Sequence, residues 1–205
     1  MIRIVLTYPE VVQDEINRIQ ILMEDDFDIL HLRKPDFSLE MMRGFVEQLP
    51  DDIQERTVIH SHFSLVHNYD LKGIHLNSKD RNQLFDVEDT GSCEIQTLIR
   101  SGDEIWVNRR PVNHVSYSAH SVKEINELNF KVDYAFLSPV YNSISKLDYP
   151  SAFEDKEQLR DELVFCQSKV VALGGVDNEK IEQLGEIGFA GYAMLGAIWN
   201  NEIEV

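Results

Sequence analysis

The sequence predicts a single-domain α/β protein of the (β/α)8 barrel (TIM barrel) class, and three observations support this. Short apolar segments with strand character alternate with amphipathic segments of helical periodicity. Strict alternation of this kind is typical of parallel strands joined by right-handed crossovers. The 205 residues fit one domain, residues 1–205, at the low end of the size range of such barrels. An open doubly wound sheet is the alternative architecture.

Eight strands are expected, in chain order at residues 2–6, 29–32, 57–59, 73–76, 115–118, 134–137, 170–173 and 192–195. Helices are expected at residues 11–24, 38–49, 63–68, 121–129, 153–163 and 178–187. Ile16, Ile19 and Met23 share the apolar face of the first helix, and Ser38 is a suitable N-cap for the second. These assignments give each strand except the fourth and the last a following helix.

Two regions depart from this pattern. Residues 77–114 form a long and mostly polar connection after the fourth strand, which predicts a surface insertion with a local helix at 94–99 and a strand at 105–107. After the eighth strand only residues 197–201 have helical character, so we expect a shortened C-terminus without a full closing helix. Either a neighbouring subunit covers the barrel there, which makes a homo-oligomer one expectation, or the barrel is simply shorter.

The composition narrows the classes of partner. The chain has 19 basic and 36 acidic residues, a net charge of −17, which disfavours nucleic acid and anionic membranes as partners. It has neither a secretory signal nor an apolar stretch of roughly 20 residues, so we expect a cytoplasmic protein. Cys93 and Cys166 are the only cysteines, which fits a reducing compartment.

Polar residues gather at the expected carboxyl ends of the strands, where barrels of this class carry their chemistry. In strand order these residues are His31, Arg33 and Lys34; His60, Ser61 and His62; His75 and Asp80; Ser118 and His120; and Ser143, Ser145 and Lys146. Strand periodicity places His31 and Arg33 on the same face of their strand, and likewise Ser118 and His120 on the same face of theirs. Each histidine alone is more often structural than catalytic, and Lys34 is expected to be a solvated loop charge. Their convergence at one mouth favours a functional site.

Glycines follow the last two strands. The seventh ends in Gly174 and Gly175, and the eighth runs into Gly196 and Ala197. Glycine lets main-chain amides approach an anion, and the loops after strands seven and eight are a common phosphate site in such barrels. We therefore expect a phosphate site here, with tight turns as the alternative interpretation. A zinc site of His60, His62 and His75 is disfavoured, because no cysteine or helical His-x-x-x-His pair accompanies them.

The ordered series of motifs resembles the thiamine phosphate synthase/TenI family. The matching segments are residues 29–34, 73–76, 118–121, 133–140, 171–176 and 193–197, so the resemblance covers nearly the whole chain except residues 81–113. It implies a (β/α)8 barrel whose small-molecule ligand is hydroxyethylthiazole phosphate or its carboxylate.

Synthases of this family join the thiazole to a pyrimidine diphosphate, and magnesium holds the departing pyrophosphate. The resemblance assigns Arg33 to the family's Gln-x-Arg-x-Lys motif, but His31 replaces the Gln and Pro35 the Lys. His60 and Ser61 replace the family's Asn-Asp pair, so Asp80 alone remains as a magnesium ligand. Loss of one electrostatic contact of this kind typically costs roughly a hundredfold in rate. These replacements disfavour efficient synthase chemistry.

The TenI branch shifts a proton in thiazole carboxylate phosphate, which needs a general acid and base and no cofactor. Histidine suits this role, and we expect His120 and His31 to act in it with Ser118 orienting the substrate. Anionic groups would contact Arg33, Ser143, Ser145 and Lys146. Tautomerase chemistry is the leading hypothesis. The alternatives are a magnesium-dependent synthase using Asp80, a non-catalytic paralogue that binds a pathway phosphate, and another phosphate-binding barrel enzyme such as a sugar phosphate isomerase.

Overall fold

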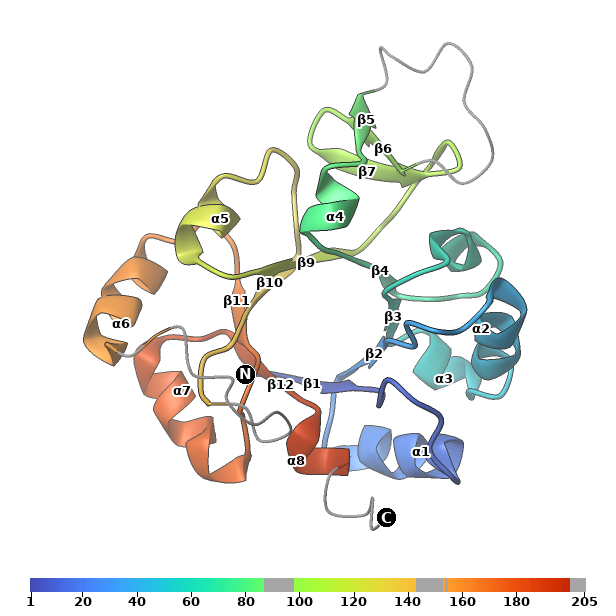
Figure 1. Cartoon of the computed structure of the whole chain (residues 1–205), viewed down its shortest axis with the longest axis horizontal. Coiled ribbons are helices and arrows are strands. Elements are labelled where there is room, and N and C mark those ends of the chain that lie inside the picture. Colours follow the sequence, from blue (N-terminus) through green and yellow to red (C-terminus); the bar gives the residue numbers. More distant parts are fainter. Residues whose placement is uncertain (87–97, 143–152, 154, 200–205) are drawn as a thin grey trace.

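The computed structural model describes residues 1–86, 98–142, 153 and 155–199, and these residues form a closed barrel of parallel strands (Figure 1). Around the barrel the strands follow the order β1-β12-β11-β10-β9-β4-β3-β2. Their bounds are β1 (Ile2–Leu6), β2 (Ile29–Leu32), β3 (Thr57–Ile59), β4 (Gly73–Leu76), β9 (Val115–Ala119), β10 (Tyr134–Leu137), β11 (Val170–Ala172) and β12 (Gly191–Met194). The expected barrel is confirmed, and closure between β1 and β12 rules out an open doubly wound sheet.

Helices surround the barrel on its outside (Figure 1). They are α1 (Glu15–Asp25), α2 (Leu39–Val46), α3 (Asp51–Gln54), the 3-10 helix η1 (Phe63–His67), α4 (Ser78–Arg81), α5 (Val122–Asn126), α6 (Lys156–Val164), the 3-10 helix η3 (Asn178–Lys180), α7 (Ile181–Ile187) and α8 (Gly196–Trp199). Ser38 caps α2 as expected, because its side chain accepts a hydrogen bond from the Met41 amide. The first helix was predicted to begin at residue 11, which is wrong. Asp14 has a left-handed conformation (φ 57°) that a right-handed helix cannot include.

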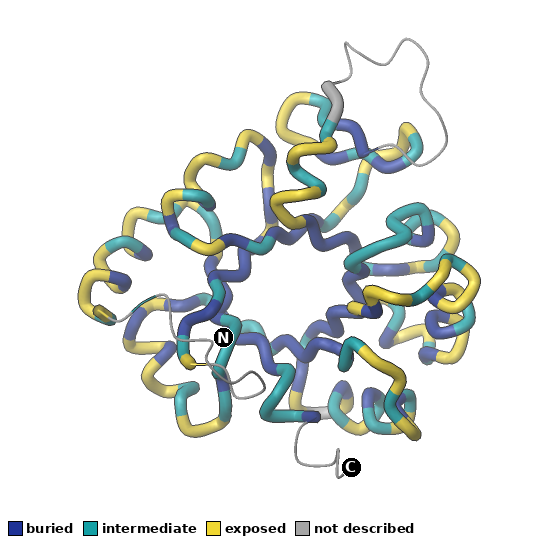
Figure 2. The backbone as a smooth tube through the Cα atoms, in the orientation of Figure 1, coloured by how far each residue is buried: buried dark blue, intermediate teal, exposed yellow. Residues whose placement is uncertain are grey.

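The strands bury side chains on both faces, and the barrel wall is the most deeply buried part of the backbone (Figure 2). Between strands and helices lies the larger apolar cluster, which includes Ile19, Met23 and Met42. Inside the barrel lies a smaller one, which includes Ile4, Phe136 and Val171. Successive residues of a strand face opposite sides. The inner face therefore also carries the polar residues that alternate with outward-facing apolar ones.

The segment after β4 forms a second sheet in the order β5-β6-β7-β8, outside the barrel beside α4 (Figure 1). Its strands are β5 (Phe85–Asp86), β6 (Leu98–Ser101), β7 (Glu104–Val107) and β8 (Arg110–Pro111). The strand expected at 105–107 is confirmed. The helix expected at 94–99 is wrong for Leu98 and Ile99, which pair with β7, and residues 94–97 lie outside the described part.

This small sheet is more than the surface insertion that the sequence suggested. Ile105 and Val107 are 1% and 2% exposed and belong to the larger apolar cluster. The Val107 carbonyl oxygen also lies 3.0 Å from His67 Nε2 in η1. Because α4 has only four residues, the small sheet supplies apolar surface that a longer helix would otherwise provide.

A helix begins directly after the last barrel strand, where the sequence predicted helical character. Helix α8 has four described residues, Gly196–Trp199. Trp199 is fully buried, and its indole N–H donates to the Leu6 carbonyl oxygen at 2.8 Å. One aromatic side chain therefore closes the seam between the first and last βα units. Residues 200–205 lie outside the described part.

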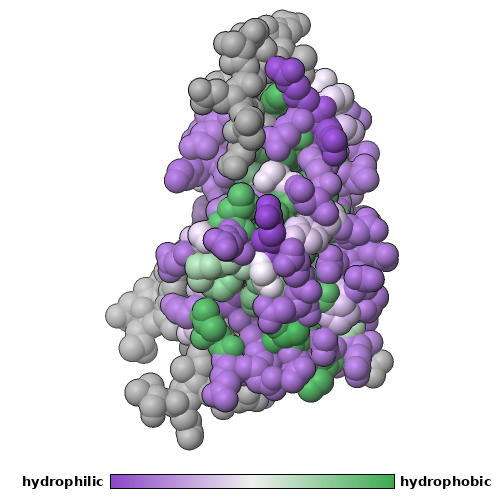
Figure 3. Space-filling model, turned by 90° about the vertical axis from the view of Figure 1, so that its right-hand side faces the viewer, coloured by the Kyte–Doolittle hydropathy of each residue, from purple (hydrophilic) through white to green (hydrophobic). Residues whose placement is uncertain are grey.

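Hydrophilic side chains predominate on the face shown in Figure 3, and apolar side chains are scattered among them. Among the helices of the described residues, none is both long and apolar enough to cross a bilayer.

Candidate functional site

His120 follows β9 at the carboxyl end of the barrel and is exposed. Its Nδ1 lies 2.9 Å from the Ser138 carbonyl oxygen, and its amide donates to Glu124 Oε2 at 2.9 Å. A carbonyl oxygen only accepts hydrogen bonds, so Nδ1 carries the hydrogen. In neutral His120 the lone pair is therefore on Nε2, which has no partner among the described residues. This side chain is held as a base with one defined basic atom.

Gly174 and Gly175 follow β11 and both have left-handed backbones, with φ of 89° and 67°. A Cβ on Gly175 would lie 2.1 Å from the Asn142 carbonyl oxygen, and one on Gly174 would lie 2.8 Å from Pro139 Cα. The turn therefore packs against the segment that follows β10. Within the described part of the chain, neither glycine amide donates a hydrogen bond. The two glycines therefore form a tight turn, and their two amides are available to bind an anion.

The next strand end contributes a second pair of amides. Gly196 and Ala197 begin α8 directly after β12, and their amides likewise find no acceptor among residues that the structure describes. Because β11 and β12 are hydrogen-bonded neighbours, both turns lie in one sector of the mouth. Ser138 connects this sector to His120, since its Oγ would lie 3.2 Å from a Cβ on Gly174 and its carbonyl oxygen holds the imidazole.

Arg33 follows β2 and is exposed. Its backbone is fixed by Thr7, whose Oγ1 accepts from the Arg33 amide at 2.9 Å and donates to its carbonyl oxygen at 3.1 Å. Burial lowers the pKa of His75 to about 3, and the positive charge of Arg33 adds to that effect. Arg33 thus lies at the carboxyl end of the strand that carries His31.

Lys34 is not the solvated loop charge that the sequence suggested. It is 1% exposed, and its Nζ lies 2.6 Å from Glu15 Oε2 and 2.6 Å from the Glu10 carbonyl oxygen. Burial lowers the pKa of Lys34, although the hydrogen bond to Glu15 opposes this effect. The side chain joins the loop after β2 to α1 and does not take part in the mouth.

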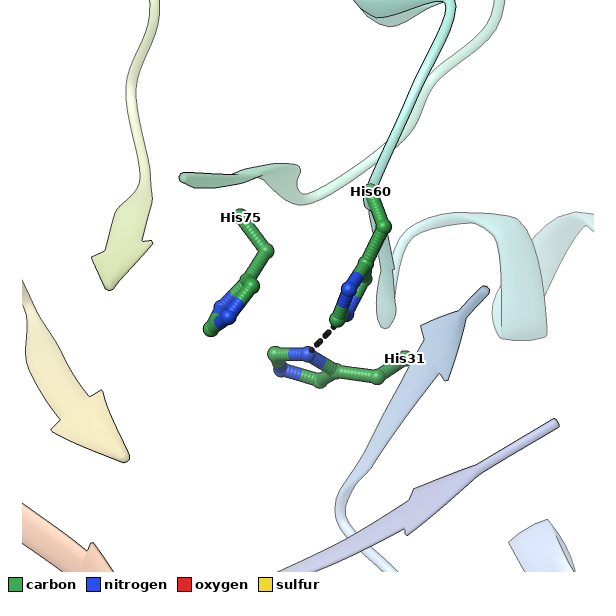
Figure 4. A group of neighbouring side chains, drawn as sticks. All are labelled: His31, His60 and His75. Atoms are coloured by element: carbon green, nitrogen blue, oxygen red, sulfur yellow. Dashed lines mark hydrogen bonds between the residues drawn. The ribbon is translucent and has the colours of Figure 1, made fainter. Parts of the chain in front are cut away.

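Three histidines converge inside the barrel at its carboxyl end. His31, His60 and His75 come from β2, the end of β3 and β4, and their rings lie next to one another (Figure 4). His31 Nδ1 lies 2.8 Å from His60 Nε2, and the His60 and His75 rings stack at 4.2 Å. Burial holds the pKa of His31 and of His60 well below the ordinary value, so all three imidazoles are neutral at neutral pH.

Hydroxyl groups satisfy the remaining nitrogens of two of these rings. His31 Nε2 lies 2.6 Å from the Tyr134 hydroxyl. His75 Nδ1 and Nε2 lie 2.8 and 2.6 Å from Ser116 Oγ and Ser118 Oγ. His31 and Ser118 thus both contact this group of buried side chains, but His31, which the sequence placed at the mouth, is fully buried beneath it. Sequence reasoning missed Tyr134 and Ser116, although strand periodicity places Ser116 on the same face as Ser118.

The three-histidine group differs from the zinc set considered from the sequence. His31 takes the third position, while the His62 ring turns to the Phe37 carbonyl oxygen at 2.8 Å. The chain direction changes at His62, which has a left-handed backbone with φ of 52°. One nitrogen of each ring in the observed group lies within 4.8 Å of the others.

Asp80 sits in a helix cap. Its Oδ2 accepts from the Asn77 amide at 3.0 Å, and the two residues form a reciprocal capping box at α4. No cluster of three or more carboxylate, histidine or cysteine ligands in the described part includes Asp80. Magnesium prefers several oxygen ligands, so these residues do not fit the magnesium site expected for a synthase. Ser143, Ser145 and Lys146 lie outside the described residues.

The chain is similar to a known protein family and to solved structures. A family profile described as thiamine monophosphate synthase matches residues 104–198. A crystal structure of thiamine phosphate pyrophosphorylase from Bacteroides thetaiotaomicron is 31% identical, with a TM-score of 0.73, and the match covers 98% of this chain and 85% of that one. Thiamine phosphate pyrophosphorylase from Pyrococcus furiosus shares the fold at 15% identity and a TM-score of 0.67, over 96% and 86% of the two chains. No curated protein sequence matches the chain.

Proposed function

The chain belongs to the thiamine phosphate synthase/TenI family, and on this premise we propose that it is a thiamine-pathway enzyme that moves a proton within a thiazole carboxylate phosphate. The observation that carries the proposal is His120, an exposed imidazole with a fixed tautomer beside a sector of main-chain amides that have no acceptor among the described residues. A base with a defined free nitrogen next to an anion site is what a proton shift in a phosphorylated substrate requires.

The phosphate would accept hydrogen bonds from the amides of Gly174, Gly175, Gly196 and Ala197. Arg33 would pair with a second anionic group such as the carboxylate. The resemblance adds Ser143, Ser145 and Lys146 to the groups that contact anions. Local positive groups of this kind are needed in a chain whose net charge is −17, because the overall field repels an anionic substrate.

In the proposed reaction His120 Nε2 removes a proton from a ring carbon of the substrate and returns it to an exocyclic carbon that is double-bonded to the ring, so that the double bond moves into the ring and the ring becomes aromatic. The bond pattern changes but no electron is gained or lost, so the reaction is an isomerisation. While the proton is on His120, the Ser138 carbonyl oxygen accepts from Nδ1–H and stabilises the imidazolium. Ser118 would orient the substrate. His31 would act behind the mouth through the network of buried histidines.

The synthase reaction is the second candidate, and two observations favour it. The relative from B. thetaiotaomicron is called a pyrophosphorylase, and Arg33 and Asp80 retain family positions. Against it, Pro35 and Ser61 replace charged groups of the synthase motifs, and Asp80 is used in a helix cap. With these replacements, few charged groups are left to stabilise a departing pyrophosphate.

One pair of assays tests the proposal. The protein is incubated with thiazole carboxylate phosphate alone, and separately with thiazole phosphate, pyrimidine diphosphate and magnesium. We expect conversion of the first substrate, followed by NMR of the ring protons, and little thiamine phosphate in the second mixture. Thiamine phosphate formed at an ordinary turnover rate would overturn the preference. Tight binding without turnover would indicate a non-catalytic paralogue, and indifference to thiazole compounds another class of phosphate-binding barrel.

A further inference from the structure

We propose that His31, His60 and His75 form a binding site for one transition-metal cation of the zinc type. The site lies inside the barrel, and the proposal does not depend on the proposed function. Its first support is the convergence of three imidazoles from three neighbouring strands, with one nitrogen of each within 4.8 Å of the others (Figure 4). Three histidines around one open position are a known zinc arrangement.

The nitrogens of His31 and His60 need only a small adjustment, whereas the His75 nitrogen, which lies within 4.8 Å of the other two, would move closer to them. Zinc–nitrogen bonds of about 2.0 to 2.1 Å in a tetrahedral site place neighbouring nitrogens roughly 3.3 Å apart. His31 Nδ1 and His60 Nε2 are 2.8 Å apart, so this hydrogen bond would open by about half an ångström. One of the two rings would also change tautomer to present a lone pair. No proton leaves the protein, because both rings stay neutral.

Hydroxyl groups are already in place as outer partners of two ligands. With His31 Nδ1 facing the metal, its Nε2–H would donate to the Tyr134 hydroxyl at 2.6 Å. With His75 Nε2 facing the metal, its Nδ1–H would donate to Ser116 Oγ at 2.8 Å, and the Ser118 hydroxyl would turn away. Partners of this kind fix the orientation of metal-bound histidines. The arrangement is that of a supported site and not of three unrelated polar side chains.

The chemistry selects the type of cation. Imidazole nitrogens suit zinc, cobalt and nickel, whereas magnesium prefers oxygen ligands. Burial keeps the rings unprotonated, which leaves their lone pairs available. The positive charge of Arg33, an exposed residue two positions after His31 at the end of β2, favours an anionic fourth ligand such as hydroxide or a carboxylate over neutral water. His60 is half-buried at the mouth and gives the cation its access.

Metal titration of the full-length chain tests the site. Protein stripped with a chelator is titrated with Co2+, whose visible absorption reports tetrahedral coordination, and then with Zn2+. We expect one Co2+ per chain, with displacement by Zn2+. The variants His60→Asn and His75→Asn should each lose affinity by more than about 100-fold, and Tyr134→Phe, which keeps all three ligands, should lose roughly 10- to 100-fold.

His62→Asn is the matched control. It removes a histidine two positions from His60 whose ring bonds the Phe37 carbonyl oxygen instead, and it should bind the metal like the wild type. Absence of stoichiometric binding in the wild type would overturn the proposal, as would equal binding by His60→Asn. Circular dichroism checks the fold of each variant. If the buried His75→Asn variant does not fold, His60→Asn decides the question, because His60 is partly exposed at a strand end.

Discussion

The Lys34 ammonium lies 2.6 Å from Glu15 Oε2, and the two side chains are 0% and 5% exposed. The pair joins the loop after β2 to the first turn of α1, and the rings of Phe37 and Phe45 lie 5.6 and 5.5 Å from the ammonium. Burial raises the pKa of Glu15 and lowers that of Lys34, which shows that desolvation opposes both charges. Each charge is tolerated there because the other is present.

The first prediction follows from this dependence. Glu15→Gln leaves a buried ammonium without its counter-charge, and we expect the free energy of unfolding to fall by about 3 to 5 kcal/mol. Urea unfolding measures the change. Glu10→Gln is the control, because it removes an exposed carboxylate nearby while keeping the carbonyl oxygen that Lys34 contacts. It should change stability by about 0.5 kcal/mol or less. Equal effects of the two substitutions would contradict this account of the pair.

Gly175→Ala tests the turn at the phosphate sector. The new Cβ would lie 2.1 Å from the Asn142 carbonyl oxygen in a left-handed backbone, so the turn must move. Gly102→Ala is matched to it, because Gly102 has a similar φ of 64° with open space around the position. Backbone strain alone should cost about 1 to 2 kcal/mol in Gly102→Ala. We expect a larger loss in Gly175→Ala, with weaker binding of inorganic phosphate by calorimetry. Unchanged phosphate affinity in a folded Gly175→Ala protein would remove the glycine amides from the proposed site.

His120→Asn tests the proposed base. We expect the rate constant for isomerisation to fall by about 10²- to 10⁴-fold, while calorimetry shows that thiazole phosphate still binds. Lys123→Gln changes an exposed residue of the adjoining helix and should retain activity. If His120→Asn binds the ligand and converts the substrate at the wild-type rate, another residue must be the base.

Because His114 is buried, we expect the protein to lose stability in mild acid. Its Nδ1 lies 3.3 Å from Asp133 Oδ2, yet burial outweighs this carboxylate and lowers the pKa of His114 to about 4. As pH falls below the unfolded value near 6.5, the unfolded chain takes up a proton that the folded chain does not accept until near pH 4. Stability therefore decreases through this window and levels off below it.

For this residue we expect a contribution of about 2 kcal/mol or less between about pH 7.5 and about pH 5. Urea unfolding of metal-free wild type and His114→Asn at the two pH values measures it. The variant should lose less stability on acidification than the wild type, and this difference separates His114 from the other buried histidines. An identical loss in both proteins would contradict the expectation.

The sequence predicted the barrel well because each strand is locally recognisable as a short apolar run. It also placed His31, Ser118 and His120 at the same end, since strand ends in a parallel barrel share one mouth. It predicted Lys34 wrongly, because the burial of that residue depends on Glu15, which lies on another element.

The group of His31, His60 and His75 shows a second reason why the sequence alone did not predict the whole site. His31, His60 and His75 lie on separate strands, and which of their rings meet depends on the stagger between strands, with His31 opposite Val58 and His75 opposite Ser116. No local pattern encodes that register. His62 looked equally suitable in the sequence, but the left-handed turn at this residue directs its ring elsewhere.

The small sheet beside α4 has a consequence for self-association. Closure leaves the barrel strands without free edges, whereas the four-stranded sheet ends in β8 on one side. Unpaired edges can recruit a strand from a second molecule. Here β8 is two residues long, Arg110 is exposed, and Pro111 has no amide hydrogen to offer. A short, charged, proline-containing border of this kind resists the growth of intermolecular β-structure, so this edge is protected against aggregation.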